Sequence, residues 1–186
     1  MRVVHLGERG QQPQLTACQE QTQASWSYGS EKRSRTRVGG ALMATYLLVA
    51  YQTAQSPQLL AATQELSRAD PSARFVLLVP ATPASDLLSK EEGDPTGIAR
   101  RRAASARTWL EDIGVQMADA KVGPADPLQA ISDEMEGGQS YAGIVISTLP
   151  QGVSQWLRRD LVSQARRRFP GIPVDHVISE VPAASK

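Results

Sequence analysis

Hydroxyl side chains and a glycine follow the most clearly apolar segment of the chain. Residues 147–154 read STLPQGVS and contain Ser147, Thr148, Gly152 and Ser154. Hydroxyls can donate hydrogen bonds to an anion, and a glycine lets the backbone approach it closely. A helix is predicted to begin here, and its free N–H groups and dipole favour negative charge. The segment therefore predicts an anion site, while the same residues would equally serve as a helix cap and a tight turn.

A second polar segment, Gln52 and Thr53, comes directly after the first apolar run, residues 45–51 (TYLLVAY). In an open parallel sheet, ligands bind beyond the carboxyl ends of the strands, where the strand order reverses. If the two apolar runs are central neighbours, their following loops converge. We therefore expect Gln52 and Thr53 to lie close to Ser147 and Thr148.

Strand and helix patterns alternate from residue 43 onward, which is typical of the α/β class. Strands are predicted at residues 45–51, 73–81, 115–122, 141–149 and 171–179, and helices at residues 56–70, 96–113, 126–136 and 154–168. Strands separated by helices need right-handed crossovers, so the pattern predicts a five-stranded, doubly wound parallel sheet with helices on both faces. The first and fourth strands carry the longest apolar runs and are expected in the centre. The third alternates and is expected nearer an edge.

Composition excludes several classes of site. The 186 residues contain 20 Lys+Arg and 19 Asp+Glu, a net charge of +1, so bulk electrostatics predict no nucleic-acid partner. The single cysteine, Cys18, excludes a disulfide framework and points to the cytoplasm. With only two histidines, His5 and His176, we predict no metal site and no catalytic residues. His176 falls within the fifth strand, where packing or contact with a second copy is expected.

The first 43 residues differ from the rest of the chain. They are rich in Gln, Ser, Thr and Arg and have no sustained apolar period, so residues 1–43 are predicted to be a disordered extension. A second interpretation starts the protein at Met43. Residues 44–180 are the predicted domain, and residues 181–186 a frayed C-terminus. No apolar stretch in the extension suits a signal peptide or a membrane span, so no membrane association is expected.

Nucleotide-binding motifs of other folds are missing from the sequence. It has neither G-x-x-x-x-G-K-[ST] nor G-x-G-x-x-G after a strand, and the fourth strand does not end in the Asp of a receiver domain. The arginine runs at residues 100–102 and 166–168 are interpreted as solvated helix faces. A patch for RNA or an acidic partner is the alternative.

The order of the segments resembles the universal stress protein family. LLVAY, FVLLVPAT, VGPADPLQAI, YAGIVISTLP, GVSQWLRRDL and GIPVDHV follow one another across residues 44–178. More narrowly, the chain is similar to a divergent bacterial branch with S-T-x-P-x-G-x-S-x-W-L-x-x-D-L after the fourth strand. The resemblance implies an adenine nucleotide alpha hydrolase-like fold with strand order 3-2-1-4-5, homodimers joined along the fifth strand, and a role in stress survival.

ATP-binding members of that family carry an acid after the first strand and a glycine series after the fourth. Here Gln52 and Thr53 replace the acid, Ser147 and Thr148 stand where glycine is expected, and only Gly152 matches. Side chains at those positions obstruct a triphosphate. We therefore expect a non-enzymatic homodimeric stress-response module with unknown protein partners. Its degenerate nucleotide pocket would comprise Gln52, Thr53, Ser147, Thr148, Gly152 and Ser154. The alternative is a sensor that binds ATP, AMP or another adenine nucleotide, with at most slow hydrolysis.

The fifth strand supports the homodimer on physical grounds. Residues 173–178 begin at Pro173, end at Ile178 and are mostly apolar. At a sheet edge their unpaired N–H and C=O groups invite a partner strand. We expect a charge at Val177 to yield a monomer.

Overall fold

The computed structural model describes residues 36–38, 41–82, 94–150 and 160–180, all of them within the unit Lys32–Lys186. Their helices and strands are, in chain order, β1 (Thr36–Val38), β2 (Ala41–Met43), β3 (Thr45–Val49), α1 (Pro57–Ala69), β4 (Arg74–Pro80), α2 (Pro95–Asp112), β5 (Met117–Gly123), α3 (Pro127–Glu136), β6 (Gly143–Thr148), α5 (Leu161–Arg168) and β7 (Val174–Ile178).

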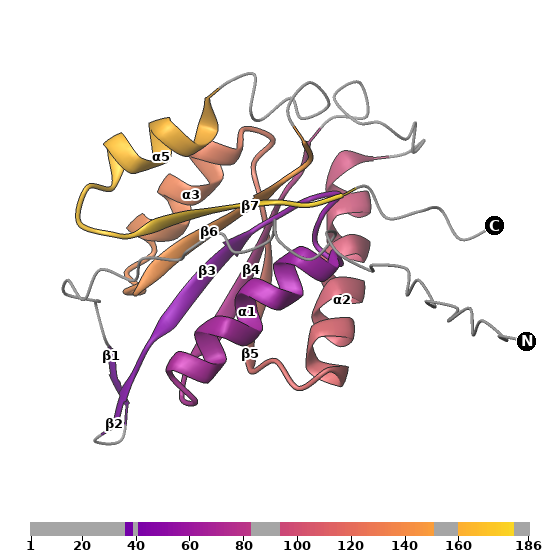
Figure 1. The fold of residues 1–186 in the computed structure, drawn as a ribbon. Helices are drawn as coiled ribbons and strands as arrows, with labels where there is room; N and C mark the ends of the chain where they lie inside the picture. The colour runs from indigo at the N-terminus through magenta and orange to yellow at the C-terminus, as the bar shows by residue number, and fades with distance from the viewer. Residues whose placement is uncertain (1–35, 39–40, 83–93, 151–159, 181–186) are drawn as a thin grey trace, which may run out of the picture. The chain divides into compact units, whose positions relative to one another are not determined.

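Five parallel strands form the main sheet in the order β5-β4-β3-β6-β7. Counted along the chain within this sheet, the order is 3-2-1-4-5. Helices α1 and α2 lie on one face, and α3 and α5 lie on the other (Figure 1). The predicted doubly wound α/β fold is therefore confirmed. The winding direction reverses between β3 and β6, so their carboxyl ends flank the crevice where such sheets bind ligands.

Burial distinguishes the central strands from the edges. Every residue of β3 and β6 is buried, as expected for strands covered by helices on both faces. Strand β5 is half-exposed and carries Asp119 and Lys121, which fits the predicted edge position. Charged side chains on an edge strand oppose pairing with another chain.

Helix starts repeat one local pattern, an oxygen-bearing cap followed by proline. Ser56 Oγ accepts from the backbone N–H of Leu59 at 3.2 Å before α1. Asp126 Oδ1 accepts from the N–H of Gln129 at 2.8 Å before α3. Proline suits the first helical turn because its missing N–H is not needed there. Ser56 and Asp126 are the first residues of the predicted ranges 56–70 and 126–136, so the predicted starts of these helices are confirmed to within one residue.

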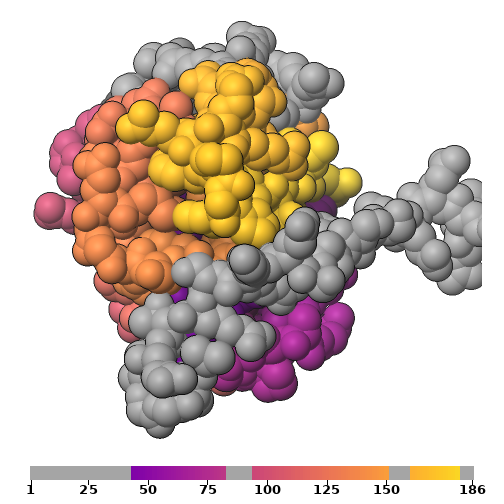
Figure 2. Space-filling view, turned by 90° about the vertical axis from the view of Figure 1, so that its left-hand side faces the viewer, coloured from indigo at the N-terminus to yellow at the C-terminus, as the bar shows by residue number. Residues whose placement is uncertain are grey.

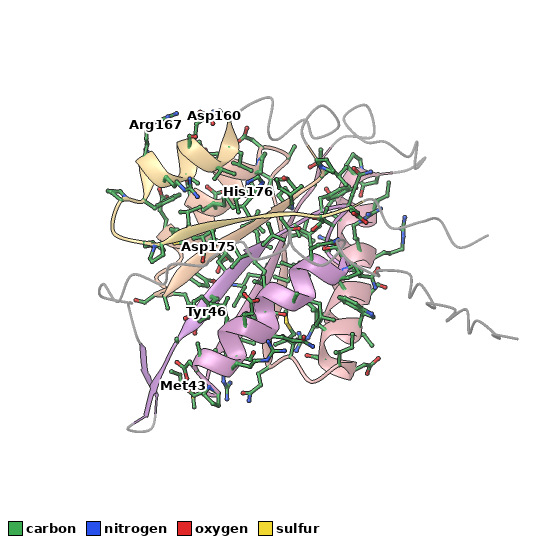
Figure 3. The ribbon with its side chains drawn as sticks, viewed as in Figure 1. Met43, Tyr46, Asp160, Arg167, Asp175 and His176 are labelled. Atoms are coloured by element: carbon green, nitrogen blue, oxygen red, sulfur yellow. The ribbon has the colours of Figure 1, made fainter. Side chains whose placement is uncertain are left out.

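Helix α5 is shorter than the sequence predicts. A single helix over residues 154–168 was expected, but α5 begins at Leu161 and the preceding Asp160 has φ of 52° and ψ of 38°. A right-handed helix cannot continue through a left-handed residue, so the prediction of one continuous helix is wrong. Gly152, Ser154 and Trp156 lie outside the described residues. Asp160 forms the expected surface ion pair, with Arg167 at 3.7 Å (Figure 3).

An antiparallel hairpin precedes the sheet, where an extension without structure was predicted. Strands β1 and β2 pair with Thr36 opposite Met43 and Val38 opposite Ala41. The sequence between them is Gly-Gly, a pair that favours two-residue hairpins. Composition over a long window does not reveal such a short local turn signal. The predicted disordered extension over residues 1–43 stays a prediction.

A polar contact holds α3 between β5 and the start of β6. The Tyr141 hydroxyl donates to Glu134 Oε1, and Lys121 Nζ lies 2.7 Å from the same oxygen. Burial, together with the bond to Glu134, raises the pKa of Tyr141. The phenol therefore stays a neutral donor over the whole physiological range. Helix α3 also packs closely against the end of β5, at Gly123.

Close packing at Gly123 gives a stability test of the α3 face. A Cβ atom on Gly123 would lie 2.6 Å from Ala130 Cβ and 3.2 Å from Leu78 Cδ1. Because Ala130 sits on a helix backbone, relief requires α3 to move. We expect Gly123→Ala to lower the free energy of unfolding by about 1–3 kcal/mol in urea titration.

Gly171→Ala is the matched control, since a Cβ there has no atom within 4 Å. Its free energy of unfolding should stay within about 0.5 kcal/mol of the parent protein. Equal effects of the two substitutions would contradict the packing of α3 on the end of β5.

Candidate functional site

The predicted convergence of the two polar loops is found at the carboxyl ends of β3 and β6. Strands β3 and β6 are in register with Val49 beside Ile146. Beyond them, the Thr53 hydroxyl donates to the backbone carbonyl of Ser147 at 3.0 Å. Thr53 and Ser147, 94 residues apart in the chain, are thus brought together as expected.

Three serines from separate segments form a hydroxyl cluster, defined as Ser56, Ser147 and Ser179. Ser179 Oγ lies 2.8 Å from Ser56 Oγ and 2.9 Å from Ser147 Oγ. The N–H of Ser179 also donates to the carbonyl of Thr148 at 2.8 Å, which extends the ladder between β6 and β7. The cluster therefore joins the start of α1 to the ends of β6 and β7.

These hydroxyls face the protein interior. Thr53, Ser147 and Thr148 are exposed by 2%, 1% and 2% respectively. Each has a partner within the protein, and a buried hydroxyl deprived of its partner is costly. In the structure these hydroxyls are thus engaged in contacts within the protein. Sequence reasoning found the positions of these groups but not their orientation.

A histidine that the sequence assigned to packing lies beside one of the predicted site residues. His176 Nε2 is 2.8 Å from Thr148 Oγ1. Burial, and secondarily the positive charge of Arg166, lower the pKa of His176. The ring is therefore neutral at pH 7. Strand register sets this diagonal contact between Thr148 and His176, which chain spacing does not reveal.

Arg166 has a structural partner, although it was interpreted as part of a solvated face. Its Nε and Nη2 donate to the carbonyl of Val174 at 3.2 and 3.1 Å. This contact connects α5 with the first residue of β7. It also fixes a positive charge that acts on the His176 ring, which Figure 3 labels on β7.

Other polar groups lie where β3 and β4 end. Gln52 is half-buried. The Arg102 guanidinium lies 4.7 Å from the centre of the Tyr51 ring, a cation–π contact between α2 and the end of β3. Thr82, two residues beyond β4, is 5% exposed, and its Oγ1 has no hydrogen-bond partner among the residues that the structure describes. Sequence reasoning missed Thr82, since only its burial marks it.

Metal chemistry finds no support in the part of the chain that the structure describes. There, no three His, Cys, Asp or Glu side chains gather as a metal-binding group. The same residues contain no helix with the length and apolar character needed to cross a membrane.

The sheet order and the two helix layers define a doubly wound α/β domain of 3-2-1-4-5 order. No family model and no curated protein matches the sequence. Among solved structures, the chain is similar to a universal stress protein from Archaeoglobus fulgidus, with 13% identity and a TM-score of 0.48. The alignment covers 72% of this chain and 93% of that one.

Ser179 is the central member of the hydroxyl cluster and can be tested by removing one oxygen. Ser179→Ala leaves Ser56 and Ser147 without their shared partner in a buried place. We expect the free energy of unfolding to fall by about 1–3 kcal/mol, measured by chemical denaturation.

Ser105→Ala makes the same chemical change at an exposed hydroxyl, which contacts Gln55 Nε2 at 3.2 Å. Its cost should stay within about 0.5 kcal/mol. If Ser179→Ala were as mild as this control, the cluster would not hold the three segments together.

Proposed function

We propose that this chain is a universal stress protein-like domain that works as a homodimeric stress-response module and binds protein partners without catalysis. The internal bonding of the predicted ligand groups carries the proposal. Thr53 and Ser147 bond across the β3–β6 crevice, and the Ser147 side chain is bonded to Ser179. Groups that would hold a phosphate in a working pocket instead hold the strands together.

The segments that resemble the family support the same proposal. They occur in the order that the sheet requires, and the strand order is the one that the resemblance implies. Gln52 stands where ATP-binding members have an acid. A degenerate pocket is therefore the best account of this edge of the sheet. We place the domain in the cytoplasm, in keeping with its single cysteine.

A sensor of adenine nucleotides is the second candidate function. One observation favours it, the buried Thr82 hydroxyl that has no partner beyond the end of β4. Buried hydroxyls are normally hydrogen-bonded, so a ligand atom at this place would satisfy the group. The two candidate functions predict different responses to nucleotides.

Thermal unfolding of the full chain with ATP, ADP and AMP separates the two functions. A ligand at 100 times its dissociation constant stabilises a protein by about 2.7 kcal/mol, which shifts the transition measurably. We expect no shift with any of the three, and none with inorganic phosphate as the control. A shift that Thr82→Val abolishes would instead establish the sensor.

Strand β7 is the proposed dimer edge. In the described part of the chain it pairs with β6 alone, and its last residue, Ile178, is 54% exposed. The opposite edge, β5, carries Asp119 and Lys121. Covering a large apolar side chain favours association, whereas charges discourage it. The mostly apolar edge is therefore the better partner for a second copy.

Ile178→Lys tests the dimer edge better than a charge at Val177. Val177 is only 7% exposed and belongs to the core, so a charge there would unfold the domain. A lysine at residue 178 places its charge in the proposed interface and leaves the core of each copy unchanged. We expect the dimer dissociation constant to rise about tenfold to a hundredfold in sedimentation velocity.

Ile113→Lys is the matched control, because Ile113 is also an exposed apolar residue, at 42%, but lies at the end of α2. It should leave the dimer intact. A dimer that survives Ile178→Lys with its affinity unchanged would exclude β7 as the interface.

A further inference from the structure

Strand β7 has a histidine at its centre. It comprises five residues, Val174–Ile178, and His176 is the third of them. Side chains of a strand alternate between the two faces of the sheet. Val174, His176 and Ile178 therefore share one face. Ser179, on the other face, bonds Ser56 at the start of α1, so these three side chains lie on the face of α5. Figure 2 shows α5 and β7, in yellow, beside the orange surface of α3.

Symmetry restricts how two copies of this strand can pair. Two identical edge strands that continue one sheet around a two-fold axis run antiparallel. Residues that lie opposite each other must point to the same face, so their numbers differ by an even amount. One residue then always faces its own copy, and the question is which.

When two copies of β7 pair over their whole length, His176 is the residue that faces its own copy. In that register Val174 lies opposite Ile178, which covers the apolar side chain that is 54% exposed in one copy. The Val174 carbonyl, which accepts from Arg166 in one copy, accepts from the partner strand instead. Moving the axis to Asp175 would set two carboxylates against each other, and like charges directly opposite are destabilising. Moving it to Val177 would set Val174 opposite Glu180 and shorten the paired segment.

We propose that two copies pair along β7 with the two His176 rings facing each other across the axis, so that protonation of these rings separates the dimer. This regulation rests on the dimer proposed above and makes its dissociation depend on pH. The neutral rings pack between two Val174–Ile178 pairs. The charged rings repel each other at the centre of the interface.

The surroundings of His176 already disfavour its charged form. Strand β6 offers the Thr148 hydroxyl at 2.8 Å and has no ionisable residue. Helix α5 contributes Arg166, whose charge acts with burial to lower the pKa of His176. Helix α1 meets the end of β7 through Ser56 and Ser179, on the opposite face, and its Glu65 and Arg68 are exposed. Acidic neighbours on the strand are Asp175, which points to that opposite face by alternation, and Glu180 beyond its end.

The sign of the effect follows from proton linkage. Pairing buries the ring further and brings a second ring close, so the dimer binds fewer protons than two monomers. Dimer affinity is therefore full above the pKa of His176 in the monomer and falls as the pH drops through and below that value. Each unit by which pairing lowers the pKa of one ring corresponds to about a tenfold loss of affinity at acid pH.

Sedimentation velocity of the full chain between about pH 8 and about pH 5.5 tests the proposal, with circular dichroism at each pH to confirm folding. We expect the dimer dissociation constant to rise at least about tenfold toward acid pH. His176→Gln, which keeps a hydrogen-bonding group for Thr148, should form a dimer whose affinity does not change with pH. His5→Gln removes the only other histidine and should retain the wild-type response.

The outcomes separate this inference from the dimer itself. A wild-type dimer of constant affinity across the range would overturn the role of His176 and leave the dimer in place. A response that persists in His176→Gln, or disappears in His5→Gln, would also overturn it. A chain that stays monomeric at every pH would remove both the dimer and its regulation.

Discussion

Buried hydroxyl groups must find hydrogen-bond partners, and in this domain that constraint organises the carboxyl side of the sheet. Ser179 bonds both Ser56 and Ser147, and so links the start of α1, the end of β6 and the end of β7. The three segments are far apart in the sequence, although β6 and β7 are neighbours in the sheet. Because an unmade bond in this buried place is costly, their positions depend on one another. The hydroxyl cluster therefore stabilises the place between β3 and β6 where the strand order reverses.

The same bonds bear on function. A phosphate-binding edge needs donors that point outward and backbone that a ligand can approach. Here the donors nearest the crevice point inward, and Thr53 bonds the backbone carbonyl of Ser147. An interaction module has no need of an open crevice and gains stability from closing it. The proposed role of the domain in binding other proteins, its own copy included, follows from this use of polar groups.

The two sheet edges differ in the same physical terms. Strand β5 ends the sheet with charged side chains, and Lys121 is in addition held by Glu134 of α3 at 2.7 Å. Strand β7 ends it with an exposed isoleucine and a half-buried histidine whose pKa is lowered. Strand β7 also carries Asp175, but its histidine is the group on this strand whose charge changes near neutral pH. A histidine at an edge strand gives association a dependence on pH that lysine or aspartate could not provide.

Local chemistry of the chain determined the elements and their starts. Apolar runs, the Ser56-Pro57 and Asp126-Pro127 caps, and Gly114, at φ of 92° after α2, act within a few residues, so the strands and most helix bounds could be predicted. The start of α5 could not, because the left-handed Asp160 interrupts a good helical pattern. Contacts of the site were decided by the tertiary structure alone. Ser56 meets Ser179 across 123 residues, and Thr148 meets His176 across 28. Such bonds depend on which strands are neighbours, on their register and on the side that each side chain faces, and these are set only when the sheet assembles.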